Sequence, residues 1–515
     1  MPVTTTLFDG GTVIDPTRAT AHDWALVDDD RIVATGSRSD VPDAQRRIDL
    51  RGATLAPAFC DAHVHLPATG LYEAGLDLRS EKSARRILAA LGERAKGGDA
   101  LLFGGNFEDP LDEPLDAAAL DGAVGDRPAL LARADMHSCV VSSALLDSLD
   151  IDDLEGVDRD EEGRPTGYLR EAAAGRAWSW FERSLSARQQ REALRRAARR
   201  AYSKGVASVH EMYVVEWRGW GSLDVVSTEA TNMALNVTLY VGTTDVERVQ
   251  ALGLSRIGGD LFLDGSFGSH TAWLMRPYRS PPPAGIPPTG LSYRDDEEVA
   301  SFFAHAQQVG MQVGVHAIGD AAIEQAIGAW EQVASVVGVE PVRSLGHRIE
   351  HFECASDEHI TRALRLGLRA SVQPAFDLFW GGSEGLYADR LGPGRALQMN
   401  RFASMHRAGL ILGAGSDSTV TPLDPILGMD ALRRHHVAQE SVDARDALCI
   451  HTLGGHILAG QEAERGTFDA GRAADLVALD RNPLTAAAEE AAGTEVVGTW
   501  IGGRRVWPEA DMEAA

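Results

Sequence analysis

Short apolar runs alternate with longer amphipathic segments through the central part of this chain. Residues 189–203, 296–308 and 321–337 repeat their apolar positions at intervals of about 3.6, which predicts helices. The apolar runs between them are short enough for buried strands. This alternation predicts an α/β fold, a distorted (β/α)8 TIM barrel built on parallel strands. The predicted strands end near His65, His210, Val241, Asp264, His316, His351, Gln373 and Asp417.

Both ends of the chain show a different pattern, of β-like runs separated by turn residues. Neither end has enough such runs for a convincing sheet of its own. We therefore predict a small composite β-sandwich made from residues 1–57 and 466–515, with the barrel in 58–465. Residues 70–200 are too long for a simple barrel connection. They are predicted to be an insertion after the first strand, which covers the mouth of the barrel and sets substrate selectivity.

Composition argues against several classes of function. The formal charge of −26 disfavours nucleic acid and anionic membranes as partners. No apolar run approaches the roughly 20 residues that cross a bilayer, and the N-terminus has no pattern of a secretory signal. The four cysteines are far apart and favour reduced thiols. We expect a cytoplasmic protein that acts on a small molecule, with no nucleic-acid partner and no membrane partner.

Candidate metal ligands lie where the predicted strands end. His63 and His65 occupy alternate positions, so their side chains leave one strand on the same side. His316, His351 and Asp417 close three later apolar runs. The C-terminal ends of barrel strands converge on one face, so we expect these five side chains to meet. Four imidazoles and one carboxylate suit a borderline divalent cation such as zinc.

Each of these residues also has an interpretation without a metal. A buried histidine can simply bond a backbone carbonyl, and Asp417 can cap a helix or a turn. Five residues with such separate structural roles would have to fall by coincidence at strand ends, so one shared metal site is the simpler interpretation. His347 is interpreted as structural, and Glu211 as a candidate residue in the wall of the site.

With these motifs the chain resembles the amidohydrolase superfamily, and within it amidohydrolase family 3, the group that includes N-substituted formamide deformylase. The resemblance spans almost the whole length. Its motifs are Ala-Pro-Ala-Phe-Cys-Asp-Ala-His-Val-His at 56–65, Asp-Gly-Ser-Phe-Gly-Ser-His-Thr-Ala at 264–272, His-Ala-Ile-Gly-Asp at 316–320, Arg-Ile-Glu-His at 348–351 and Gly-Ser-Asp at 415–417.

The resemblance implies a metal-dependent hydrolase of a non-peptide carbon–nitrogen bond, an amide or N-acyl group. One or two divalent ions, zinc above all, are expected on the four histidines and Asp417. Zinc lowers the pKa of a bound water to about 7, and Asp417 is expected to carry a proton from that water to the leaving nitrogen. Deamination, cyclic-amide opening and a non-catalytic scaffold or binding role are alternatives. A homodimer is an expectation of the resemblance only.

The chain departs from its relatives at the fourth strand. Many relatives carry there a lysine whose carbamate bridges two metals, and Asp260 stands at the aligned position. Lys82, Lys96 and Lys204 are the only lysines and lie elsewhere, so no carbamylated lysine is expected at this strand. We expect a mononuclear site, or a binuclear site with an altered bridge in which Asp260 is a candidate ligand.

Four further residues are candidates for binding substrate: His137, Asp264, His270 and Gln373. His137 has the alternative of a surface or hinge histidine, and Asp264 that of a turn residue before a glycine. Four aromatic residues suggest an apolar pocket, or else ordinary core packing: Trp273, Phe376, Phe379 and Trp380.

Overall fold

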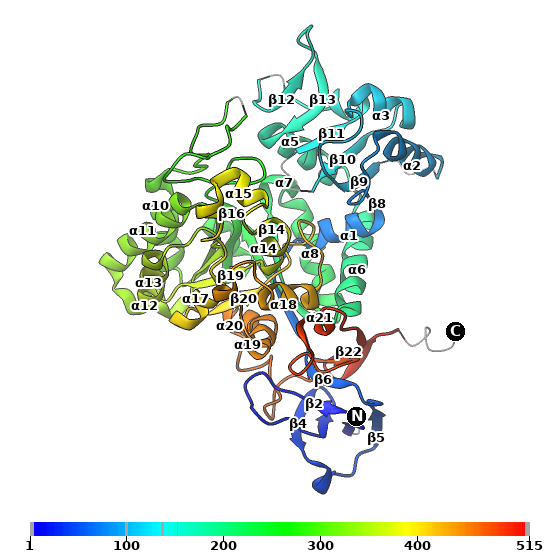
Figure 1. Ribbon diagram of the computed structural model, residues 1–515, viewed down its shortest axis with the longest axis vertical. Helices are drawn as coiled ribbons and strands as arrows, with labels where there is room; N and C mark the ends of the chain where they lie inside the picture. The colour runs from blue at the N-terminus through cyan, green and yellow to red at the C-terminus, as the bar shows by residue number, and fades with distance from the viewer. Residues whose placement is uncertain (1–4, 98–100, 135–137, 152, 284, 510–515) are drawn as a thin grey trace.

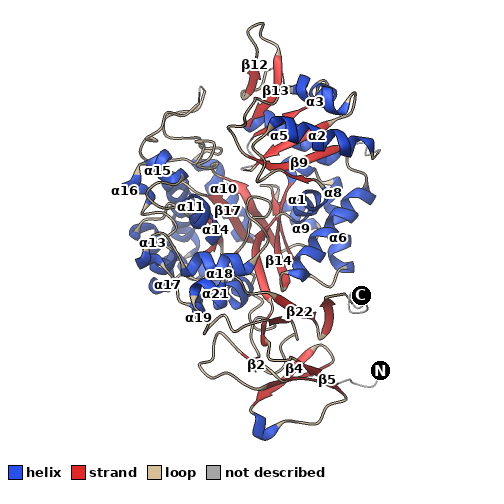
Figure 2. Ribbon diagram, turned by 45° about the vertical axis from the view of Figure 1, so that its right-hand side comes forward, coloured by secondary structure: helices blue, strands red, loops and turns tan. Residues whose placement is uncertain are grey.

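The centre of the molecule is an eight-stranded parallel sheet that curls almost into a closed barrel (Figure 2). The computed structural model describes residues 5–97, 101–134, 138–151, 153–283 and 285–509. A parallel bridge between Val64 and Ser418 links the first strand to the segment after the last one. The barrel prediction is thus confirmed. In chain order its strands are β7 (Phe59–Val64), β14 (Val206–Val214), β15 (Asn236–Gly242), β16 (Arg256–Phe262), β17 (Gln312–Ala317), β18 (Arg348–His351), β19 (Arg369–Val372) and β20 (Leu412–Ala414).

Helices cover the outside of this sheet. The three helices predicted from periodicity are α6 (Ala187–Ser203), α10 (Asp296–Gln308) and α11 (Asp320–Val337). α6 begins at a capping box formed by Ser186 and Gln189, and α11 ends before Gly338. The other barrel helices of seven or more residues are α8 (Gly221–Asn232), α12 (Val339–Leu345), α13 (Asp357–Leu366), α14 (Pro374–Trp380), α17 (Phe402–Ala408) and α18 (Pro425–Arg433).

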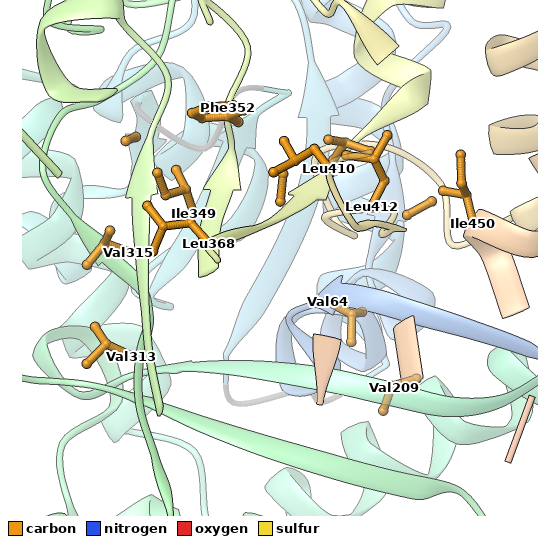
Figure 3. Packing of buried hydrophobic residues seen from close by; sticks show 14 of the residues in the cluster. Val64, Val209, Val313, Val315, Ile349, Phe352, Leu368, Leu410, Leu412 and Ile450 are labelled. Atoms are coloured by element: carbon orange, nitrogen blue, oxygen red, sulfur yellow. The ribbon is translucent and has the colours of Figure 1, made fainter. Parts of the chain in front are cut away.

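One large apolar cluster joins the strands to the helices (Figure 3). Val313 of β17, Ile349 of β18 and Leu412 of β20 are buried members of it. Trp330 of α11 is fully buried, and its ring stacks on that of Phe303 with centroids 4.3 Å apart. The strands are therefore packed on both faces, which gives the residues at their C-terminal ends a rigid frame.

The ends of the chain form two sheets at the opposite end of the molecule from the insertion (Figure 1). Residues of both sheets, Phe8 and Ala25 from one and Leu55, Leu476 and Trp500 from the other, share one buried cluster. The N-terminal sheet has the order β4 (Arg31–Gly36), β3 (Trp24–Asp28), β1 (Thr5–Asp9) and β5 (Arg46–Asp49). The mixed sheet has the order β2 (Thr12–Val13), β6 (Thr54–Pro57), β21 (Leu476–Leu479), β22 (Val496–Ile501) and β23 (Arg504–Trp507).

The long segment after β7 carries a six-stranded sheet of its own (Figure 1). It follows α1 (Leu66–Ala74) and leads into α5 (Glu171–Arg183), which precedes α6. Its strands run in the order β12 (Val157–Arg159), β13 (Pro165–Arg170), β11 (Ser138–Val141), β10 (Ala129–Arg133), β9 (Leu102–Phe107) and β8 (Leu76–Asp77), with α2 (Ala84–Lys96) and α3 (Ala117–Val124) beside them. No helix among the described residues is long and apolar enough to cross a membrane.

Candidate metal centre

Six of the side chains predicted to bind metal meet at the C-terminal ends of the barrel strands. None of them is more than 6% exposed. Two of the six have backbone φ values in the left-handed region, His351 at 72° and Asp417 at 50°. Such conformations are unfavourable for non-glycine residues and persist where the surrounding structure holds them, often at functional sites. The six are His63, His65, Asp260, His316, His351 and Asp417.

The histidines from the first strand are oriented by acceptors behind them. His63 Nδ1 donates to a carboxylate oxygen of Glu350 at 2.9 Å, and His65 Nδ1 donates to the carbonyl of Met212 at 2.9 Å. Because carboxylates and carbonyls only accept, these bonds fix the proton on Nδ1 in each ring. The Nε2 lone pairs of both rings therefore face the centre of the site.

Hydrogen bonds also orient the other two histidines, but the donor is Nδ1 in His351 and Nε2 in His316. His351 Nδ1 donates to the side-chain oxygen of Gln373 at 2.7 Å, which leaves Nε2 toward the centre. His316 Nε2 donates to the carbonyl of Gly265 at 3.3 Å, and its Nδ1 lies 3.0 Å from Asp260. The four imidazoles thus present four acceptor nitrogens to one small volume.

Asp260 lies between the two histidine pairs. Its carboxylate oxygens are 3.3 Å from His65 Nε2 and 3.9 Å from His63 Nε2. They are also 3.0 Å from His316 Nδ1 and 3.6 Å from His351 Nε2. This one carboxylate is therefore within 3.9 Å of all four imidazoles.

Asp417 closes the side of the site next to the first strand. Its Oδ1 lies 3.3 Å from His65 Nε2 and 3.5 Å from His63 Nε2. The backbone places it there, since Asp417 N–H donates to the carbonyl of His63 at 2.8 Å. His63, His65 and Asp417 form one group of possible ligands, and His63, Asp260 and His351 form a second.

These separations fit a divalent cation. Ligand atoms about 2.1 Å from a tetrahedral zinc lie about 3.4 Å from one another. His63 Nε2 and Asp417 Oδ1 are fully buried and have no hydrogen-bond partner among the described residues. Lone pairs that face carboxylates at such short range repel one another unless protons or a cation lie between them. The donor set therefore suits one or two cations such as zinc.

The pKa values of His351 and Asp417 reflect how closely imidazoles and carboxylates lie in this site. Burial acts to lower the pKa of His351, but contact with Asp260 and the charges of Asp417 and Asp260 raise it to about 9. Burial alone would raise the pKa of Asp417, yet His63, His65 and His351 keep it below its usual value. The raised pKa of His351 therefore reflects the negative charge that the two carboxylates bring into the site.

Asp260 reaches the centre through a local irregularity of β16. Gly258 and Gly259 have φ values of 80° and 72°, and the pairing of β16 with β17 shifts register just after them. A Cβ on Gly259 would lie 2.6 Å from Met212 Sδ and 2.7 Å from Tyr240 Cβ. Only glycine fits this conformation and this space, and the bulge re-aims the residue that follows.

A buried charge network stands behind His63. Glu350 accepts from Arg348 Nε at 2.5 Å and from its Nη2 at 2.7 Å. Arg348 is fully buried, also donates to the carbonyl of Ala62 at 2.6 Å, and lies over the ring of Tyr240. Burial would raise the pKa of Glu350, but Arg348 and His63 lower it to about 2. The ionised carboxylate would make the His63 imidazole a stronger metal ligand.

Among the described residues predicted to bind substrate, only His270 lines the main cavity. His270 faces that cavity and has its Nε2 3.0 Å from Ser280 Oγ. The carboxylate of Asp264 accepts from the N–H groups of Trp273, Ile318 and Gly319 at 2.8–3.0 Å, and so braces loops. Gln373 lies behind His351. His137 lies outside the described residues.

The cavity above the metal centre has a volume of about 1590 Å³ and is lined by both the barrel and the insertion. Its aromatic lining near the centre, Trp217, Phe262 and Tyr293, was not predicted from the sequence. The role of Glu350 behind His63 was not predicted either. The only sequence signal for Glu350 was its place in the Arg-Ile-Glu-His motif.

Comparisons with known proteins agree with this geometry. A protein-family model described as "Amidohydrolase family" matches residues 46–507. The putative amidohydrolase YtcJ of Bacillus subtilis is 28% identical over 526 residues, which cover 94% of this chain and 96% of YtcJ. N-substituted formamide deformylase of Arthrobacter pascens is 25% identical, with 93% of each chain covered. The crystal structure of an uncharacterized metal-dependent hydrolase from Pyrococcus furiosus superposes with a TM-score of 0.76 at 27% identity, covering 93% of this chain and all of that one.

Proposed function

This chain belongs to the amidohydrolase family, and on that premise we propose that it hydrolyses a non-peptide carbon–nitrogen bond, an amide or N-acyl group, in a small molecule. The observation that carries the proposal is the meeting of four acceptor nitrogens and two carboxylates in a buried site. The unpartnered His63 Nε2 and Asp417 Oδ1 lie within that site. Burying such groups without a compensating ion is costly.

The proposed metal ligands are the four histidines together with Asp260 and Asp417. Asp260 lies between the His63–His65 pair and the His316–His351 pair, so its carboxylate would help these histidines to hold one or two divalent cations. It would take the place that a carbamylated lysine has in many relatives. When bound, zinc supplies a Lewis acid that lowers the pKa of a water and polarises the substrate carbonyl.

Asp417 is the proposed proton carrier. Its Oδ1 has no other partner, and its pKa is held below the usual value, so the carboxylate is ionised and ready to accept a proton from the attacking water. The same oxygen then returns the proton to the leaving nitrogen. An amide needs this second transfer, because an amine anion is a very poor leaving group.

The test measures metal content and turnover on the same protein. Zinc-loaded and chelator-treated protein are assayed for release of amine from formamides, N-acyl amino acids and cyclic amides. We expect turnover with zinc, loss on chelation and recovery on adding zinc. The variant Asp417→Asn should lose roughly 10²–10⁴-fold in kcat, whereas the exposed Asp43→Asn control should not. Zinc-loaded protein without activity on any of these amides would contradict the proposal.

A further inference from the structure

An aromatic wall leads away from the metal centre into the main cavity. The ring centroid of Trp217 lies 6.2 Å from that of His65 and 5.5 Å from that of Phe262. Phe262 in turn lies 4.8 Å from His316 and 6.5 Å from Tyr293. Trp217, Phe262 and Tyr293 line the same cavity as Asp260. A flat apolar group bonded near the reacting carbon would therefore lie against these rings.

Helix α5 of the insertion also lines this cavity. At its start, Glu171 Oε2 lies 3.4 Å from the hydroxyl of Tyr293. At its end, Arg183 donates to the carbonyl of Glu216 at 3.1 Å, next to Trp217. The helix thus spans the aromatic wall from one end to the other.

The cavity-facing side of α5 carries two arginines without carboxylate partners. Arg176, Ser179 and Arg183 are spaced by three and four residues, so they share one side, and all three line the cavity. Within the described ranges no carboxylate lies within 4 Å of Arg176 or Arg183. In a chain with a formal charge of −26, two unpaired cations facing one cavity point to an anionic ligand.

The other charged groups around the cavity do not provide such a site. Four further arginines each face an acidic side chain. These pairs are Arg133–Asp109, Arg170–Asp158, Arg294–Glu216 and Arg390–Asp389. Asp150 and Glu155 line the cavity from the insertion, and Glu155 lies beside Gly285 of the proline-rich loop. An anion would be repelled there and attracted to α5.

We propose that the substrate has an aromatic group next to the bond that is hydrolysed and a carboxylate at its far end, which Arg176 and Arg183 bind. This inference rests on the proposed hydrolase function and adds its substrate class. A volume of about 1590 Å³ exceeds the roughly 300–1,000 Å³ common for small-ligand pockets, so an elongated molecule fits. Arginine suits the role because its guanidinium stays charged and can form two hydrogen bonds with one carboxylate.

The test uses matched N-formyl benzylamines whose ring carries, directly or through one to three methylene groups, either a carboxylate or a neutral carboxamide. For the best spacer, zinc-loaded protein should show a kcat/KM roughly fivefold to tenfold higher on the carboxylate, an effect that salt reduces. In Arg176→Gln and Arg183→Gln this ratio should fall toward one. The exposed Arg188→Gln on α6, outside the cavity lining, should keep the wild-type ratio. Replacing the ring by cyclohexane should lower kcat/KM.

A binding measurement, which does not require hydrolysis, tests this inference separately from the hydrolase proposal. Calorimetry on zinc-loaded protein compares the carboxylate and carboxamide forms of the corresponding amines. A carboxylate preference that Arg176→Gln abolishes supports the inference even if no amide is hydrolysed, in which case only the hydrolase proposal fails. Equal binding and equal kcat/KM for the two forms, at every spacer length, would overturn the inference.

Discussion

The substitution Gly259→Ala tests how β16 brings Asp260 into the metal centre. Gly259 has a φ of 72°, and an added Cβ would lie 2.6 Å from Met212 Sδ and 2.7 Å from Tyr240 Cβ. Neither neighbour can move freely, because both are buried. The strand must therefore shift or leave its bulge, and the carboxylate of the next residue moves with it.

Two effects should lower the free energy of unfolding of Gly259→Ala. A non-glycine residue in this backbone region costs about 1–2 kcal/mol, and overpacking a filled interior costs about 1–3 kcal/mol more. Gly310→Ala is the matched control. Its φ is also 72°, but its added Cβ would meet no atom within 4 Å. The free energy of unfolding of this control should fall only by the cost of the backbone conformation, about 1–2 kcal/mol.

Two assays are applied to wild type and both variants. Urea unfolding of the metal-free protein measures the free energy of unfolding, and titration with zinc against a competing chelator measures zinc affinity. Gly259→Ala should be less stable than Gly310→Ala by about 1–3 kcal/mol. It should also bind zinc roughly 10–100-fold more weakly than wild type, the range found when groups that hold ligands are changed. Gly310→Ala should bind zinc as wild type does. If the two variants are equally stable and bind zinc equally well, the bulge does not position Asp260 and this reasoning is wrong.

Three further predictions concern the groups behind the centre and in the barrel wall. Glu350→Gln removes the charge that strengthens His63, so zinc affinity should fall roughly tenfold. The exposed Glu358→Gln is its control. Equal zinc affinity in the two variants would contradict the role of Glu350. Burial acts to lower the pKa of His351, but Asp260 and Asp417 raise it to about 9, so cation binding must displace a proton from this ring at lower pH. Zinc affinity should therefore rise with pH up to about 9 and level off above it, and a flat profile between pH 6 and 9 would contradict this. Trp330→Ala should destabilise the protein by roughly 3–5 kcal/mol through the cavity it leaves, measured by urea unfolding, without changing zinc stoichiometry.

The sequence was sufficient for the barrel because its signals are local. Apolar runs and 3.6-residue periodicity predicted the strands and the helices α6, α10 and α11, and packing did not override them. The same local logic placed the side chains of His63 and His65 on one side of the chain where β7 ends. Because strand ends of a parallel barrel converge, His351 and Asp417 could be assigned to the same face before any distance was known.

Other features depended on contacts between distant segments. The sequence showed that Asp260 replaces a lysine, but only the glycine bulge of β16 shows how so short a side chain lies within 3.9 Å of four imidazoles. Glu350 of β18 is 287 residues from His63 of β7, and these two strands are not neighbours in the sheet. Their pairing follows from the curling of the sheet into a barrel, not from spacing. At the ends of the chain, the sequence showed only separate β-like runs, and their order within two sheets that share one buried cluster depends on contacts between the two termini.

The sequence by itself therefore determined which side chains leave the strand ends, because backbone periodicity fixes the side on which each one emerges. The tertiary structure decided how far each reaches and what it faces. Bulges, barrel closure and the placement of α5 over the aromatic wall depend on close packing of segments far apart in the chain. That is why the meeting of these histidines and carboxylates could be predicted from residue types, whereas Arg176 and Arg183 became visible only once the cavity was formed.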